Sequence, residues 1–159
     1  MKVGDLVIVA NLGEMKVYRA EPRDLEAEAG LKPQNIKLDQ VNAIDYVEAH
    51  WKVKDIVTDE AGRFKAPNGT NGGMTEKHGI EQKMEEDVIK AIADDIARMV
   101  NEYNPPKYFL ALPQTIFQRV WDRISQDVKT KLFRYVEEDL TKIDRNKLPE
   151  IFKEKGKHF

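Results

Sequence analysis

The chain has 159 residues, of which 41% are hydrophobic and 34% charged, and its formal net charge is −2. This composition predicts a single soluble globular domain over residues 1–155, followed by a frayed tail at 156–159. The net charge argues against a general nucleic-acid binder, because such proteins are usually basic overall. No apolar run approaches the ~18 residues of a membrane span, and the absence of cysteine excludes disulfides and thiolate metal sites.

Three strands are predicted in the first part of the chain. Residues 6–10 are a continuous apolar run between turn residues, which is typical of a buried strand and not of a signal peptide. We therefore expect a cytoplasmic protein. Residues 15–20 follow a short loop containing Asn and Gly, which favours a β-hairpin, and residues 36–44 predict a third strand. Residues 50–57 fit either a strand or irregular structure.

The most unusual segment is a glycine-rich loop predicted at 62–79, which contains five of the nine glycines. No large aliphatic side chain occurs from Lys65 to Gly73, so this part of the loop cannot help to build a core. Loops of this length without secondary structure are usually functional or disordered. A helical pattern follows directly, so the loop leads to a helix N-terminus, where unpaired N–H groups and the helix dipole favour phosphate or other anions.

The second half of the chain alternates helices with strands. Apolar residues four apart predict a long helix that starts at Ile80 and stops at Asn104-Pro105-Pro106; they are Met84, Val88, Ile92 and Ile96. A strand at 108–112, a helix at 115–124, a strand within 128–136 and a basic helix from Asp144 follow. Helices between strands imply right-handed crossovers, so the expected fold is α/β, with a mixed β-sheet flanked by helices.

Several short motifs occur in this order of elements. They are Val7-Ile8-Val9-Ala10 with the hairpin to Val17-Tyr18, Asp59-Glu60-Ala61-Gly62-Arg63-Phe64, the long helix, Phe109-Leu110-Ala111-Leu112-Pro113 and Glu138-Asp139-Leu140-Thr141. Together they resemble the bacterial host attachment protein family over nearly the full length of the chain. The resemblance implies a context in the attachment of bacteria to host cells.

That family is in turn similar to the central domain of archaeal and eukaryotic class-1 release factors, which has a ribonuclease H-like fold. In those factors a Gly-Gly-Gln loop leads into a long helix and reaches the peptidyl-transferase centre of the ribosome. Here Gly72 and Gly73 match the glycine pair, and Met74 stands in place of the glutamine. Methionine cannot place an amide beside an attacking water, although the backbone N–H groups of Gly73 and Met74 remain as donors.

The resemblance and the loop together favour a non-enzymatic module that binds RNA or the ribosome. The expected binding residues all lie in or beside the loop, with the cationic ones on phosphates: Arg63, Lys65, Gly72, Gly73, Met74, Lys77 and His78. A flexible loop without a ligand is the simplest alternative. Another is a hydrolase of ribosome-bound peptidyl-tRNA that uses the loop backbone.

A metal-dependent nuclease is a less favoured alternative. Its candidate ligands are Asp5, Asp45, Asp59 and Asp139, but no acidic residue lies inside the first strand. The three histidines (His50, His78 and His158) have no standard metal-site spacing, so no structural metal is expected, and no cofactor fingerprint occurs.

The C-terminal stretch at 142–157 contains six basic and three acidic residues. Its apolar residues, which include Ile143, Leu148 and Phe152, predict a solvated amphipathic helix. A second phosphate-contacting surface is the alternative interpretation of this stretch.

Overall fold

A computed structural model describes residues 1–23, 36–51 and 72–159, with only the backbone of residues 51 and 72–78. The first part of the chain forms the predicted meander of three antiparallel strands, β1 (Leu6–Ala10), β2 (Glu14–Pro22) and β3 (Ile36–Asp45). Every residue of β1 is buried, which confirms the prediction of an interior strand from its apolar run.

Two helical elements follow the meander, a π-helical turn η1 (Val47–Trp51) and the long helix α3 (Gly72–Tyr103). The long helix begins eight residues before Ile80, so the prediction of a loop extending to 79 is wrong for its last part. The physical reason is that the apolar period marks only the part of α3 that contacts the sheet. Glu and Lys, as at positions 76 and 77, favour helix formation as well but leave no apolar period in the sequence. Asn104, with a φ of 44°, ends α3 as predicted.

The rest of the chain alternates strands and helices, as its sequence pattern predicts. The elements are β4 (Tyr108–Ala111), α4 (Gln114–Trp121), α5 (Gln126–Lys129), β5 (Leu132–Val136), the 3-10 turn η2 (Arg145–Lys147) and α6 (Leu148–Lys155). The strands form one mixed sheet in the order β3-β2-β1-β4-β5, in which β4 pairs parallel with both β1 and β5. The α/β fold is therefore confirmed, and the ribonuclease H-like assignment stays a prediction.

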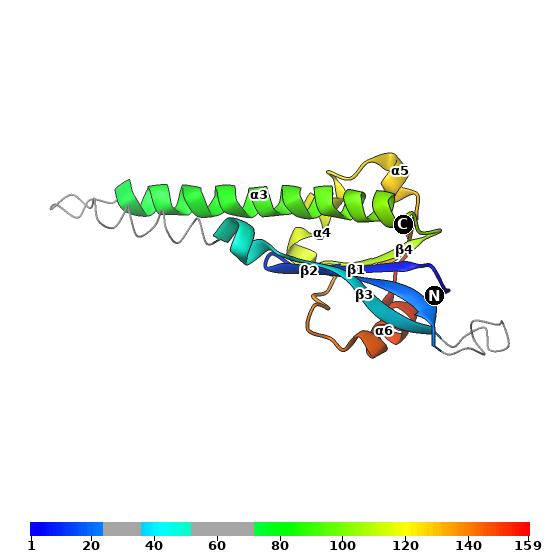
Figure 1. Ribbon diagram of the computed structural model, residues 1–159. Helices are drawn as coiled ribbons and strands as arrows, with labels where there is room; N and C mark the ends of the chain where they lie inside the picture. Colours follow the sequence, from blue (N-terminus) through cyan, green and yellow to red (C-terminus); the bar gives the residue numbers. More distant parts are fainter. Residues whose placement is uncertain (24–35, 52–71) are drawn as a thin grey trace.

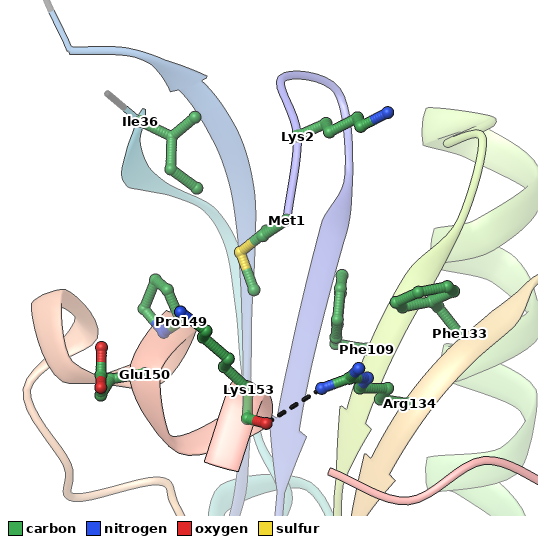
Figure 2. A pocket seen from close by; sticks show the side chains of 9 residues that line it. All are labelled: Met1, Lys2, Ile36, Phe109, Phe133, Arg134, Pro149, Glu150 and Lys153. Atoms are coloured by element: carbon green, nitrogen blue, oxygen red, sulfur yellow. Dashed lines mark hydrogen bonds between the residues drawn. The ribbon is translucent and has the colours of Figure 1, made fainter. Parts of the chain in front are cut away.

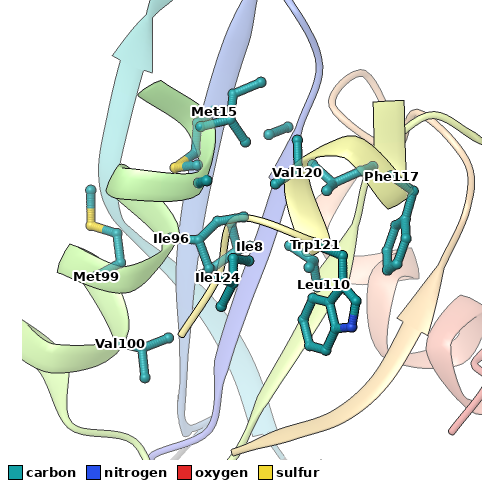
Figure 3. Packing of buried hydrophobic residues seen from close by; sticks show 14 of the residues in the cluster. Ile8, Met15, Ile96, Met99, Val100, Leu110, Phe117, Val120, Trp121 and Ile124 are labelled. Carbon is teal, nitrogen blue, oxygen red and sulfur yellow. The ribbon is translucent and has the colours of Figure 1, made fainter. Parts of the chain in front are cut away.

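Helices cover both faces of the sheet (Figure 1). The side chains of β1 accordingly alternate between two hydrophobic cores, one on each face. Leu6, Ile8 and Ala10 join the larger core beneath α3, α4 and α5, part of which is drawn in Figure 3. Val7 and Val9 point to the other face, where the smaller core includes buried residues of α6. The central strand thus has no solvent-facing side, which explains why its sequence is apolar without alternation.

The N-terminal part of α3 extends past the end of the sheet (Figure 1). Its fully buried residues begin at Val88, and residues 79–87 are half-buried or exposed. At about 1.5 Å per residue, the 32 residues of α3 span about 48 Å. The sheet therefore holds the C-terminal half of the helix, and the N-terminal half carries Gly72 outward.

The last residues of the chain are attached to the domain, so the predicted frayed tail at 156–159 is wrong. Lys157 exchanges two backbone hydrogen bonds of 2.9 Å (N to O) with Tyr135 of β5. The ring of Phe159 stacks on those of Trp121 and Tyr135, with centroid distances of 4.7 and 4.3 Å. These partners come from α4 and β5, which local sequence does not connect to the tail.

Candidate functional site

The predicted binding residues divide between described and undescribed parts of the chain. Five of them lie in the first two turns of α3: Gly72, Gly73, Met74, Lys77 and His78. Arg63 and Lys65 lie outside the described residues. The backbone of the structure therefore places five of the predicted residues together at one helix end.

The start of α3 has the electrostatics expected of an anion-binding helix end. A helix leaves its first four N–H groups without partners inside the helix, and its dipole is positive at that end. No acidic residue occurs in the first turn of α3 to neutralise this charge. Gly72 and Gly73 have no Cβ, so another molecule can approach the backbone there closely.

A cluster of ion pairs fixes α3 against α4 where the long helix leaves the sheet. The Arg119 guanidinium pairs with Glu85 at 3.4 Å and also with Glu86, and Arg123 pairs with Glu86 at 3.5 Å. The hydrogen bond from Arg119 is the main reason why the pKa of Glu86 lies below its usual value. These contacts constrain the direction in which the N-terminal half of α3 extends.

Two of the candidate nuclease ligands, Asp5 and Asp139, do not converge. Asp5 directly precedes β1, whereas Asp139 contacts Asn11, the residue that directly follows β1. The two carboxylates therefore lie at opposite ends of this strand, roughly 20 Å apart at ~3.3 Å per residue. Asp59 lies outside the described residues. Among the residues that the structure describes, no group of three His, Asp or Glu side chains is placed to hold a metal ion.

Asp139 instead belongs to a hydrogen-bonded network at the carboxyl end of β1. It accepts hydrogen bonds from the Asn11 side chain (2.9 Å) and from the Thr141 hydroxyl (2.6 Å), and Lys16 donates to the Thr141 carbonyl (2.8 Å). Burial raises the pKa of Asp139, but the bonds from Thr141 and Asn11 outweigh it and hold this pKa below its usual value.

The role of this network was not predicted. Asp139 and Thr141 stand in one of the motifs quoted above, but their partner Asn11 is 128 residues away from Asp139 in the chain. Asn11 also accepts hydrogen bonds from the backbone N–H groups of Gly13 (2.7 Å) and Glu14 (2.9 Å). The network therefore ties the β1–β2 turn to the segment after β5, and its polar groups bond one another.

The histidines that the structure describes with side chains also have structural neighbours. His50 lies near Tyr46, with ring centroids 6.3 Å apart, and His158 accepts a hydrogen bond of 3.1 Å from Arg134. In the described part of the chain, no helix combines the length and apolar character needed to cross a membrane.

A family model described as "Protein required for attachment to host cells" matches residues 6–151, from β1 into α6. No curated protein matches the chain.

Proposed function

The chain belongs to the family of proteins required for attachment to host cells, and we propose that it acts as a non-enzymatic module that binds RNA, with the ribosome as its target. The binding element is the N-terminal end of α3 together with the glycine-rich segment before it. The family description names a phenotype, so the chemistry of the proposal rests on the residues themselves.

One observation carries the proposal: the glycine pair opens a long helix that projects away from the sheet. A helix fixed at one end can deliver its other end into a recess of a larger particle. Gly72 and Gly73 let a phosphate backbone approach, the helix dipole attracts it, and Lys77 adds a positive charge within the next two turns.

The choice of the ribosome as target rests on the resemblance to the release-factor central domain that the sequence motifs suggest. In that domain a glycine pair before a long helix reaches the peptidyl-transferase centre. Met74 replaces the glutamine that orients water there, so we propose binding without peptidyl-tRNA hydrolysis. The hydrolase alternative relies only on the backbone N–H groups of Gly73 and Met74.

Co-sedimentation with ribosomes tests the proposal. The wild-type chain is expected to pellet with ribosomes at about 50 mM salt and to be released towards about 200 mM, because phosphate contacts are salt-dependent. Arg63→Ala/Lys65→Ala should weaken binding and lower the log–log salt slope by about 1.4, at ~0.7 for each lost contact to single-stranded RNA. The matched control is Lys83→Ala/Lys90→Ala, which removes two exposed charges further along α3.

A second variant separates close backbone approach from charge. Gly72→Ala/Gly73→Ala leaves the charge unchanged, yet it should reduce ribosome binding because two methyl groups then face the RNA. Unchanged sedimentation of both double variants would contradict the proposal. Release of peptide from loaded ribosomes by the wild-type chain would replace it with the hydrolase alternative.

A further inference from the structure

A groove lies between α6 and the sheet (Figure 2). It is on the face of the sheet opposite α3, because α6 and α3 cover opposite faces (Figure 1). It consists of two adjoining cavities of about 530 and 200 Å³, which share Ile36, Pro149 and Glu150 in their walls. We call the two cavities together the α6 groove. The larger cavity alone falls within the ~300–1,000 Å³ range of small-molecule sites.

The charged side chains that line the α6 groove are almost all positive. Among the described residues that line it, Glu150 is the one acid and six are cations from six different parts of the fold: Lys2, Arg23, Lys37, Arg134, Arg145 and Lys153. Such a cluster is unexpected in a chain with a net charge of −2. It creates a local positive potential that favours a polyanion.

None of these six cations forms an ion pair with a carboxylate among the described residues. Elsewhere in the described chain ion pairs are common, as for Arg19 with Glu21 and Arg98 with Asp95. Arg134 is nevertheless held in place, because its guanidinium donates to the backbone carbonyls of Phe152 (3.3 Å) and Lys153 (3.0 Å). Figure 2 shows Arg134 reaching toward Lys153 across the groove. Among the described residues, no carboxylate therefore competes with an external anion for the cations of the groove.

Apolar side chains lie between the cations. Met1, Ile36 and Phe109 line the larger cavity together with the ring of Phe133, which is 37% exposed. A ligand that fits this lining has repeated negative charges and flat apolar groups between them, which is the chemistry of single-stranded nucleic acid.

We propose that the α6 groove binds a short segment of single-stranded RNA, with phosphates on Arg134, Arg145 and Lys153 and a base against the apolar lining. The choice of RNA as ligand rests on the proposed function. The groove is a second contact, on the opposite face of the sheet from α3, and it extends the RNA footprint of the protein.

Fluorescence anisotropy of a labelled short oligouridylate tests this proposal in the full chain carrying Arg63→Ala/Lys65→Ala, so that the groove is measured without those two cations. Adding Arg145→Ala/Lys153→Ala should lower the log–log salt slope by about 1.4. If the affinity at 1 M salt is unchanged, this slope change weakens binding about 25-fold at about 0.1 M. Both residues are exposed, so circular dichroism should show an unchanged fold. Added Lys83→Ala/Lys90→Ala is the control with the same loss of charge.

Equal affinities of the groove variant and the control variant would overturn the groove as an RNA site. So would an oligoglutamate peptide that binds the wild-type groove as tightly as the RNA. Linear polyphosphate should bind more weakly than RNA, because it lacks bases, and equal binding would overturn the base contact. A failure of the α3 proposal is distinct, since it shows as ribosome binding that is unaffected by Arg63→Ala/Lys65→Ala.

Discussion

Gly156→Ala should detach the C-terminal tail from the domain. A Cβ at this position would lie 2.2 Å from the Phe152 carbonyl oxygen and 3.0 Å from the Cβ of Arg134. The backbone there has a φ of −64°, which alanine adopts readily, so the conflict is purely steric. Phe152 is fully buried in α6 and Arg134 belongs to β5, which leaves the tail as the part that can move.

The contacts of the tail set the size of the effect. Moving it breaks two backbone hydrogen bonds between Lys157 and Tyr135, each worth about 0.5–1.5 kcal/mol net. It also separates Phe159 from Trp121 and Tyr135, and such ring pairs contribute about 0.5–1.5 kcal/mol each. Phe159 is 69% exposed, so the low end of each range applies. We expect a loss of about 2 kcal/mol in the free energy of unfolding.

Urea denaturation followed by circular dichroism measures this loss, and hydrogen exchange at the Tyr135 and Lys157 amides locates it. The matched control is deletion of residues 157–159 with Gly156 retained. Gly156→Ala and the deletion should cost about the same, and the two together should cost little more than either, because both remove the same contacts. A Gly156→Ala variant as stable as the wild type, or fully additive costs, would refute the reasoning.

Two further predictions concern buried polar contacts. Tyr46→Phe should lower the free energy of unfolding, measured by urea denaturation, by about 1.5 kcal/mol, because the Tyr46 hydroxyl donates a 2.8 Å hydrogen bond to Asp95. Burial raises the pKa of this hydroxyl far above its usual value, so it stays protonated as a donor. An unchanged unfolding midpoint would contradict this contact. Asp139→Asn should destabilise the chain at neutral pH, but progressively less below pH 3.8, the ordinary pKa of this carboxyl. The pKa of Asp139 in the folded chain lies below that value, so the stabilisation by the ionised carboxylate is lost as the pH falls through the folded pKa. Unfolding curves from pH 3 to pH 7 check the trend, and a stability difference from wild type that widens in acid would show that the network of Asn11 and Thr141 does not favour the carboxylate.

The network at Asp139 and the α6 groove share a property that limited their prediction. Each is built from residues far apart in the chain, as with Asn11 and Asp139 or Lys2 and Lys153. In the sequence the cations of the groove are scattered among acidic residues, and the overall charge is slightly negative. Only the packing of α6 against the sheet places them around one cavity.

The sequence by itself determined the elements whose signals are local. The strands at 6–10 and 108–112 were predicted because burial on both faces requires continuous apolar residues. The hairpin after the first strand was predicted from the Asn and Gly of its short loop. The contact part of α3 was predicted from its four-residue apolar spacing. The family was likewise identified from short motifs, some in these segments and others at 59–64 and 138–141.

The tertiary structure alone decided the start of α3, the docking of the tail and the position of the groove. The first turns of a helix that projects beyond the sheet have no apolar period in the sequence, so the sequence pattern predicted a loop at Gly72. The tail is held by Tyr135 and Trp121, whose proximity depends on the parallel pairing of β4 with β5. Local sequence specifies the secondary structure of a segment, whereas long-range packing determines which other residues its side chains contact.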